Sequence, residues 1–296
     1  MTPPRLPTPS WRAAEPVGNP QANPHAGDAP LSGPQAERLD TPCHLIMGAS
    51  QGMGAAIARA LAAAGQSLVL AARSVDALEA VAADCRNQAP SPGQSFLLVP
   101  IDFVSNASPD ALARALAGRR LSGVLLNGGG PHGDAADSLG AQDLDSAHRL
   151  LFRGPVLHLQ AALPCVVDGA QILAITSTTV LEPHPALTLS GAYRSALTSY
   201  LKSLSDALGP RQIAVNALAP GFVATDRLAY LQDHEARRLN MPPEAVRKTW
   251  SAKAAMGRIG SPEEIASLAA FIMTGGCPFL TGQTLVVDGG QVRAVR

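Results

Sequence analysis

The sequence predicts an α/β protein built on one doubly wound parallel sheet of about seven strands. Short apolar runs alternate with helical patterns from residue 43 to residue 287. The strand runs are apolar throughout, which is typical of parallel strands that are buried on both faces. Residues 43–296 have a length that suits one large α/β domain. In such sheets, ligands bind at the carboxyl ends of the strands.

The predicted elements follow one another in a regular order. The expected strands cover 43–47, 67–72, 95–100, 123–126, 170–176, 213–219 and 284–287. The first helical pattern follows the glycines after the first strand and ends at Gly65. Further helices are expected to begin at Ser74, Ser108 and Ser261, and two others to cover 142–166 and 189–208. Pro155 and Pro164 are expected to limit or kink the long fourth helical region. The charged stretch 226–256, broken by Pro242 and Pro243, is expected to form a substrate lid.

Two helix starts carry capping signals. Ser108 is followed by Pro109 and Asp110, which predicts Ser108 as the N-cap and proline as the first helical residue. The run 261–264, Ser-Pro-Glu-Glu, predicts a capping box at the start of the last large helix.

A glycine-rich turn follows the first strand. Glycines 48 and 52 are expected to supply positive φ or close backbone approach, and Gly54 to let helix and strand pack closely. The amides at the start of the following helix carry a positive dipole end, which suits a pyrophosphate. A plain structural turn would use the same residues, so the glycines alone are weak evidence. The strand before them and the helix after them favour a dinucleotide site.

The ends of the second and third strands predict which nucleotide binds. An acidic residue at the end of the second strand would bind the ribose 2′-hydroxyl of NAD, but Ala72 stands there. Arg73 adds a cation suited to a 2′-phosphate, so we favour NADP over NAD. The alternative is that Arg73 is only a solvated arginine at the start of a helix. Gln51, which is neutral where a basic residue would help to bind the phosphate, also weakens the preference for NADP. Asp102 either accepts from the adenine amino group or is a turn residue.

The composition argues against several other kinds of protein and partner. The first 42 residues hold ten of the 25 prolines without apolar periodicity and are expected to be a disordered tail. Zero net charge argues against nucleic acid or an anionic membrane as a partner. We expect a cytoplasmic protein without metal whose four cysteines are buried free thiols. The cysteines are Cys43, Cys85, Cys165 and Cys277.

Four motifs in this order give the chain a family resemblance: 48–54 (GASQGMG), 127–130 (NGGG), 220–225 (PGFVAT) and 281–290 (TGQTLVVDGG). With them, residues 43–291 resemble the short-chain dehydrogenase/reductase family, especially its oxoacyl-carrier-protein-reductase-like branch. The resemblance implies a Rossmann fold, a nicotinamide cofactor, a small carbonyl or alcohol substrate and a homo-oligomer, commonly a tetramer. We therefore expect cofactor contacts at Gly48, Ser50, Gln51, Gly52, Met53, Gly54, Arg73, Asp102, Phe103, Asn127, Gly128, Gly129, Arg194, Pro220, Gly221, Val223 and Thr225.

The catalytic positions depart from the family pattern. The family places a serine after the fifth strand, a tyrosine thirteen residues later and a lysine four beyond it. Ser177 fits the first place, while Ser190 and Arg194 fill the other two. The helix asparagine of the family is replaced by Leu151. A shifted register would make Tyr193 the acid, with Leu197 left in the lysine place; Tyr193 is kept as a candidate on a nearby helix face.

These substitutions leave two hypotheses open. The first is an NADP-dependent oxidoreductase in which Ser177 binds the carbonyl, Arg194 supplies charge, and water, Tyr193 or His184 supplies the proton. His184 and His132 each have the alternative of being solvated loop histidines. The second is a sensor or assembly protein that binds NADP(H) without catalysis.

Overall fold

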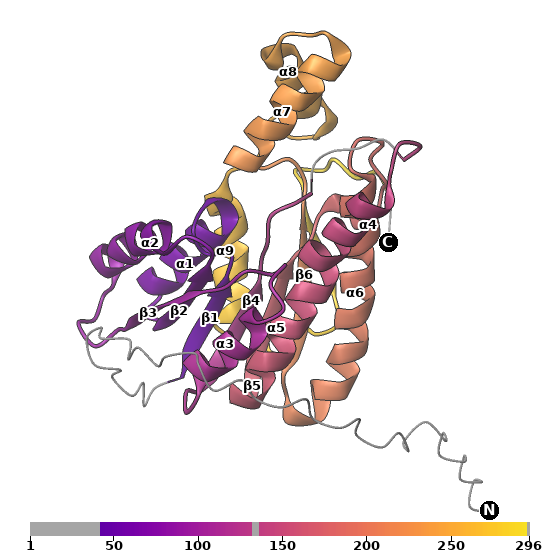
Figure 1. The fold of residues 1–296 in the computed structure, drawn as a ribbon. Helices are drawn as coiled ribbons and strands as arrows, with labels where there is room; N and C mark the ends of the chain where they lie inside the picture. Colours follow the sequence, from indigo (N-terminus) through magenta and orange to yellow (C-terminus); the bar gives the residue numbers. More distant parts are fainter. Residues whose placement is uncertain (1–41, 132–135, 295–296) are drawn as a thin grey trace, which may run out of the picture. The chain divides into compact units, whose positions relative to one another are not determined.

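The computed structural model describes residues 42–131 and 136–294 (Figure 1). The expected tail, apart from residue 42, and His132 lie outside these residues. The strands are β1 (Cys43–Met47), β2 (Leu68–Ala72), β3 (Phe96–Pro100), β4 (Leu121–Leu126), β5 (Val166–Ile175), β6 (Ala214–Pro220) and β7 (Thr284–Val287). The α-helices are α1 (Gly52–Ala63), α2 (Val75–Gln88), α3 (Ser108–Leu116), α4 (Ala141–His148), α5 (Gly154–Ala162), α6 (Thr188–Leu208), α7 (Asp226–Leu239), α8 (Pro243–Lys253) and α9 (Pro262–Met273).

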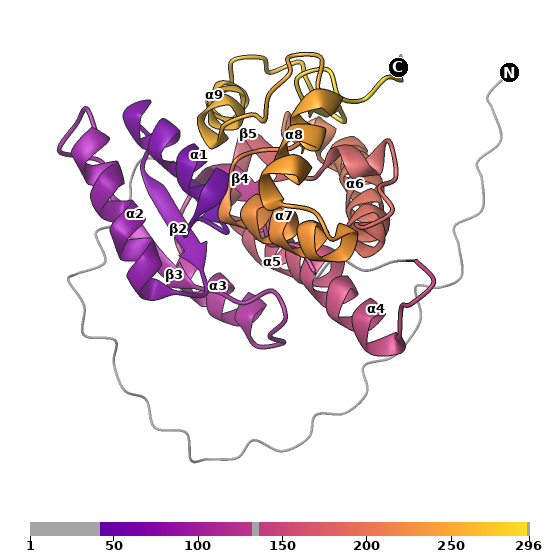
Figure 2. The ribbon, with the colours of Figure 1, turned by 90° about the horizontal axis from the view of Figure 1, so that it is seen from above.

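Seven strands form one parallel sheet, as the sequence predicts. Their order in the sheet is β3-β2-β1-β4-β5-β6-β7. The chain order reverses between β1 and β4, which lie side by side. Helices α1, α2 and α9 cover one face, and α3, α5 and α6 cover the other (Figures 1 and 2). The carboxyl ends of β1 and β4 therefore border the crevice where ligands bind in doubly wound sheets.

Burial on both faces explains why the strands are mostly apolar. In β1, Leu45 and Met47 join the core cluster beneath α3, α5 and α6, whereas Ile46 joins the cluster beneath α1, α2 and α9. All three side chains have no exposed surface. Burial of these side chains stabilises the fold by about 25 cal/mol per Å² of apolar area. His44, the one polar residue of β1, is also buried, and its Nε2 lies 3.0 Å from the Met273 carbonyl oxygen.

The α3 start differs from its prediction. The N-cap is Ala107, and Ser108 is the first residue of the helix, ahead of Pro109. The Ser108 hydroxyl is already engaged, because it accepts from the Asp102 amide at 2.9 Å and lies 2.8 Å from His158 Nε2. A tertiary partner 50 residues away has therefore replaced the local capping bond. The capping box at Ser261 is present as predicted.

The long fourth helical region is interrupted. A π-helical segment, Arg149–Arg153, separates α4 from α5 and ends just ahead of Pro155. Leu151, which stands in the place of the family asparagine, is buried in this segment. A methyl group on Gly154 would lie 2.3 Å from the Phe103 carbonyl oxygen, so α5 starts in direct contact with the loop after β3.

Helices α7 and α8 stand beyond the carboxyl end of the sheet and have a small apolar cluster of their own (Figures 1 and 2). Its buried members are Leu228, Ala236, Val246 and Trp250. The Trp250 ring stacks on Phe222 at 4.7 Å between ring centroids, which attaches the cluster to the loop after β6.

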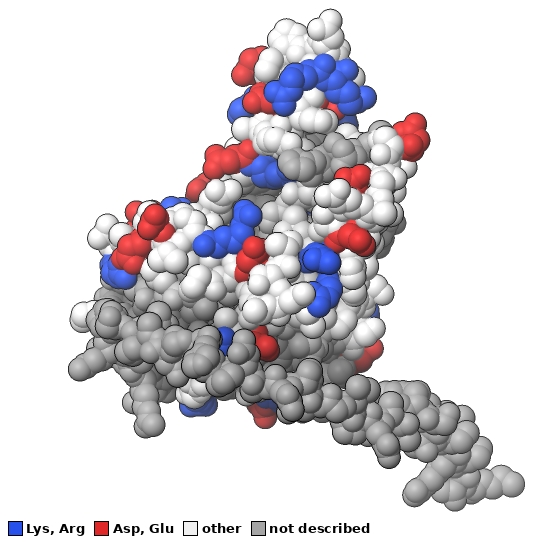
Figure 3. Space-filling view, viewed as in Figure 1, with Lys and Arg blue, Asp and Glu red and all other residues white. Residues whose placement is uncertain are grey.

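The described residues bear on the expectations about membranes, metals, charge and cysteines. Their helices include none with the length and apolar character needed to span a membrane, and they hold no cluster of metal-ligating side chains. Basic and acidic groups are interspersed on the face in Figure 3. The cysteines are unpaired; Cys43 and Cys85 are buried, but Cys165 is half-buried and Cys277 exposed, which corrects the expectation for these two.

Candidate functional site

The glycine turn after β1 is as tight as its sequence predicts. Gly48 and Gly52 have positive φ values of 68° and 55°. A methyl group on Gly54 would lie 2.0 Å from the Gly48 carbonyl oxygen, and one on Gly48 would lie 2.3 Å from the Asn127 carbonyl oxygen. No side chain fits at Gly48 or Gly54, so glycine lets the turn, α1 and the end of β4 pack directly against one another and form a backbone cradle.

Helix α1 points its amino end into this cradle. Its N-cap, Gln51, has extended backbone and makes no side-chain cap bond, and the first backbone bond of the helix runs from the Ala55 amide to the Gln51 carbonyl at 3.3 Å. The amides ahead of Ala55 are left for a ligand. Ser50 and Met53 lie in the same turn and are half-buried.

Asn127 joins the ends of β1 and β4. Its side-chain amide donates to the Gly48 carbonyl oxygen at 3.0 Å. Gly128 follows, and a methyl group there would lie 3.0 Å from the Phe103 ring. The Asn127 side chain thus shapes the cradle, and sequence reasoning that assigned it only to the cofactor missed this contact.

The ends of β2 and β3 expose the residues expected at the adenosine. Arg73 is exposed and has no ion pair among the described residues, while Ser74 accepts from the Ala77 amide and caps α2. Asp102 Oδ1 accepts from the Val104 amide at 3.1 Å, which is the geometry of a turn aspartate, and its second carboxylate oxygen is left for a ligand.

A buried Ser–His pair supports the Asp102 loop from below. His158 Nδ1 donates to the Gly154 carbonyl at 2.8 Å, so Nε2 accepts from the Ser108 hydroxyl. His158 has no exposed surface, and burial lowers its pKa, opposed by the Gly154 carbonyl and Asp102. The pair has no access to a substrate and positions the loop.

The loop after β6 closes the other side of the crevice. Val223 is buried and forms a parallel bridge with Gly260. Thr225 caps α7 by accepting from the Leu228 amide at 3.3 Å, and its methyl group lies 3.4 Å from the position a Gly52 side chain would take. Pro220 and Gly221 lead into this loop from the end of β6.

The candidate catalytic groups meet at the ends of β4 and β5. Arg194 reaches from α6 and donates through Nε to Ser190 Oγ (3.2 Å) and through Nη1 to the Ile175 carbonyl (2.9 Å). Its Nη2 lies 3.5 Å and 3.4 Å from the carbonyl oxygens of Gly128 and Gly129. The guanidinium therefore spans the two strand ends that border the crevice.

Both serines keep a hydroxyl proton. Ser177, directly after β5, accepts from the Thr179 amide at 3.2 Å, and Ser190 accepts from Arg194. Because each oxygen acts as an acceptor in these bonds, each hydroxyl is left to donate to a carbonyl oxygen. Ser190 is buried and Ser177 half-buried.

Arg194 is a half-buried cation with a second arginine, Arg227, as its neighbour. Burial, together with the neighbouring Arg227, lowers the pKa of Arg194 to about 10. Arg227 lies on α7 and donates to the Pro131 carbonyl oxygen. Sequence reasoning missed Arg227, since the lid contains several arginines and nothing in the spacing separates this one.

Among the described residues, neither candidate proton donor, Tyr193 or His184, forms a hydrogen bond with Ser177, Ser190 or Arg194. The Tyr193 ring lies against His148 of α4, with 5.7 Å between centroids. His184 Nδ1 accepts from the Ala186 amide at 3.2 Å, and its ring meets Phe222 edge-on at 6.5 Å. Burial lowers the pKa of His184, with Lys253 acting in the same direction and Glu235 against it.

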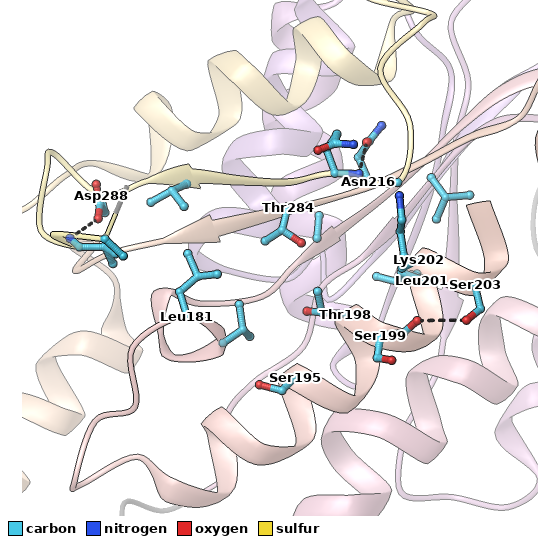
Figure 4. A pocket seen from close by; sticks show the side chains of 18 residues that line it. Leu181, Ser195, Thr198, Ser199, Leu201, Lys202, Ser203, Asn216, Thr284 and Asp288 are labelled. Atoms are coloured by element: carbon cyan, nitrogen blue, oxygen red, sulfur yellow. Dashed lines mark hydrogen bonds between the residues drawn. The ribbon is translucent and has the colours of Figure 1, made fainter. Parts of the chain in front are cut away.

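A cavity of about 740 Å³ lies away from these groups (Figure 4). It is bounded by α6, β6 and β7, and Lys202, Asn216 and Thr284 point toward it. Ser177, Ser190 and Arg194 do not line it. The candidate site is therefore defined by the converging hydrogen bonds at the strand ends.

Comparisons with known proteins agree with this geometry. The sequence profile of the family described as enoyl-(acyl carrier protein) reductase matches residues 48–291. The chain is 29% identical to NADPH-dependent reductase BacG of Bacillus subtilis, covering 84% of this chain and 97% of that protein. It is 30% identical to 1-cyclohexenylcarbonyl-CoA reductase of Streptomyces collinus, covering 83% and 85%.

A solved structure shows the same fold. The crystal structure of YwfH, an NADPH-dependent reductase involved in bacilysin biosynthesis, superimposes with a TM-score of 0.79 at 27% identity. The match covers 86% of this chain and all of that one.

Proposed function

Since this chain belongs to the short-chain dehydrogenase/reductase family and is an oxidoreductase, we propose that it reduces a carbonyl group with NADPH. The observation that carries the proposal is the position of Arg194, whose guanidinium joins the ends of β4 and β5 beside Ser190. It brings a cation and hydroxyl donors to the carboxyl edge of the sheet, where substrates of such folds react.

The cradle fits a dinucleotide. Gly48, Gly52 and Gly54 allow the tight turn that places the start of α1 at the end of β1, and this helix start offers amides to a diphosphate. Arg73 supplies a cation at the expected place of a 2′-phosphate, and Ala72 supplies no competing carboxylate. The named relatives BacG and YwfH are NADPH-dependent, which supports the same choice here.

The chain's own residues would act on the substrate as follows. NADPH, when bound, supplies the hydride. The Ser177 hydroxyl donates to the carbonyl oxygen, and Arg194 stabilises the negative charge that develops there. Ser190 holds Arg194 Nε in place. Neither Arg194 nor a serine can release a proton readily at neutral pH, so we assign the proton to water.

This assignment predicts a slow enzyme. A positioned general acid typically contributes 10²- to 10⁴-fold, or about 3 to 5 kcal/mol of the barrier. The contacts of Tyr193 with His148 and of His184 with Ala186 support water over either side chain. We further take α7 and α8 as the substrate lid.

The direct test is single-turnover oxidation of NADPH, followed by absorbance, with ketones, quinones and β-ketoacyl thioesters. Ser177→Ala should lower turnover about 100-fold with NADPH affinity unchanged, since one oxyanion donor is worth that much. Ser195→Ala, an exposed serine of α6, is the matched control and should behave as the wild type. Measurable NADPH binding with no oxidation by any carbonyl would refute the proposal.

One observation favours a second candidate, a sensor that binds NADP(H) without catalysis. Every nitrogen of Arg194 already has a protein acceptor, as a purely structural arginine would. Fluorescence titration of NADPH separates the two. In an enzyme, Arg194→Ala loses turnover as Ser177→Ala does; in a sensor, only Arg194→Ala has an effect, and it weakens NADPH binding.

A homo-oligomer is the partner we propose. The edge strand β7 exposes Val286, and Phe279 in the loop before it is 99% exposed. Phe271 of α9 is also exposed. Burying these apolar side chains against a second copy would remove them from water. Light scattering of the wild type and of Phe279→Ser should show a smaller particle for the variant.

A further inference from the structure

Arg227 reaches across the crevice from the lid. It is the second residue of α7, and its Nη2 donates to the Pro131 carbonyl oxygen in the loop after β4. A methyl group on Gly130 would lie 3.0 Å from the same nitrogen. The guanidinium carbon lies 5.4 Å from the centroid of the Tyr230 ring, one turn further along the helix. Its position is therefore fixed by contacts on both sides of the crevice.

The charges of Arg227 and Arg194 are uncompensated within the described residues. The ion pairs there use other cations, namely Arg59, Arg86, Arg211, Arg238 and Arg258. Arg194 and Arg227 bind backbone carbonyls and a hydroxyl only. Two half-buried guanidinia that repel each other are stabilised when an anion binds between them.

Arg227 also has donors to spare. Its Nε and Nη1 have no acceptor among the described residues, whereas Arg194 uses all three of its nitrogens. A guanidinium offers two parallel N–H groups to a carboxylate, a fork geometry that a single lysine cannot match. Within 42–131 and 136–294, Arg227 is thus the member of the pair with donors left for a ligand.

The position of Arg194 and Arg227 in the crevice indicates which part of a ligand they would meet. The diphosphate cradle is formed by Gly48, Gly52 and the start of α1, which Thr225 approaches. Arg194 and Arg227 instead contact the backbone at 128–131, beyond the end of β4. Arg194 also binds the end of β5, the strand that Ser177 follows. That end of the crevice receives the reacting carbonyl rather than the phosphates.

We propose that Arg227 binds the carboxylate of a keto-acid substrate whose carboxylate lies one or two carbons from the reacting carbonyl. This inference rests on the proposed function. Ser177 holds the carbonyl oxygen, Arg194 stabilises the charge that develops on it, and Arg227 holds the carboxylate, so the substrate is bound at two points. A neutral ketone of the same size lacks the second point.

The test compares two carbonyl compounds that differ only in the charged group: 2-oxo-4-phenylbutanoate and 4-phenyl-2-butanone. Wild-type kcat/KM should favour the keto acid at least tenfold. Arg227→Gln should lower kcat/KM for the keto acid about 10- to 100-fold, mainly through KM, the usual loss for one charged hydrogen bond. The ketone should change less than threefold, and Arg227→Lys should restore part of the keto-acid activity.

Two controls separate the outcomes. Arg237→Gln changes an exposed arginine on the same helix and should leave both substrates unaffected. The NADPH dissociation constant of Arg227→Gln should equal that of the wild type. Equal losses for both substrates, a wild type that prefers the ketone, or weakened NADPH binding would overturn the inference while leaving the proposed function standing. Absence of turnover with every carbonyl would overturn both.

Discussion

The proposed cofactor site and the proposed catalytic site occupy two halves of the crevice, and they depend on different parts of their residues. In the proposed cofactor half, the turn 48–54 works through its backbone: a methyl group on Gly48 or Gly54 would strike a carbonyl oxygen, and Gly52 has a positive φ. In the proposed catalytic half, Arg194 binds Ser190 and the Ile175 carbonyl at the end of β5, and the roles proposed for Ser177, Ser190 and Arg194 depend on their side chains. Backbone geometry constrains residue type strongly, whereas side-chain chemistry can be exchanged while the fold persists.

The largest effect should come from filling the backbone cradle. Gly54→Ala places a methyl group 2.0 Å from the Gly48 carbonyl oxygen, and the strand and helix must move apart. We expect a loss of about 2–3 kcal/mol in the free energy of unfolding and at least 100-fold weaker NADPH binding, measured by urea unfolding and calorimetry.

The control for this change is Gly93→Ala. The nearest atom to a methyl group there is Ser91 Oγ at 3.7 Å, and the backbone needs no positive φ. It should stay within about 0.5 kcal/mol of the wild type. If Gly54→Ala were equally harmless, the cofactor half would not depend on backbone approach, and the comparison would fail.

A smaller effect is expected at Arg73, where the cofactor half uses a side chain. Arg73→Asp should weaken NADPH binding about 10- to 100-fold and leave NADH binding unchanged or improved, since a carboxylate repels the 2′-phosphate. Arg120→Asp, at the opposite end of the sheet before β4, is the control and should alter neither. Equal losses for both nucleotides would show that Arg73 does not distinguish them.

The buried histidines beneath the cofactor half should make its stability depend on pH. Burial lowers the pKa values of His44 and His158, so the unfolded chain binds their protons at a higher pH than the folded one. Their stabilisation is complete above the unfolded pKa of about 6.5 and is lost as pH falls toward the folded values.

We therefore expect the free energy of unfolding to fall between pH 7 and pH 5, by at most about 1.4 kcal/mol per pH unit for each histidine. Urea unfolding at several pH values measures this slope. His158→Gln should reduce it while also costing stability through the lost Ser108 bond. An unchanged slope in the variant would show that His158 titrates normally in the folded protein.

The smallest effect should come from Tyr193→Phe in the catalytic half. Because the Tyr193 ring packs against His148, removal of its hydroxyl should change kcat less than twofold. The measurement is steady-state NADPH oxidation with the best carbonyl found. A loss of tenfold or more would make Tyr193 the proton donor and would bring the catalytic half closer to the family pattern.

The sequence predicted the features that depend on local physics. The bounds of β1 and β7, the positive φ of Gly48 and Gly52, and the Ser261 capping box depend on neighbours in the chain, and the structure confirms them. Ser108 was wrong as an N-cap because its hydroxyl pairs with His158, 50 residues away. The exposure of Cys277 and the position of Arg227 likewise depend on tertiary contacts that no local pattern records.

The central claim is that the backbone turn 48–54 binds NADPH and that the carbonyl chemistry is arranged around it. Calorimetric titration of the full chain with NADPH and with NADH tests this most directly. The account predicts saturable binding of NADPH, at least tenfold weaker binding of NADH, and loss of both in Gly54→Ala. Absence of any heat of binding and of any rise in Tm with millimolar NADPH would contradict it.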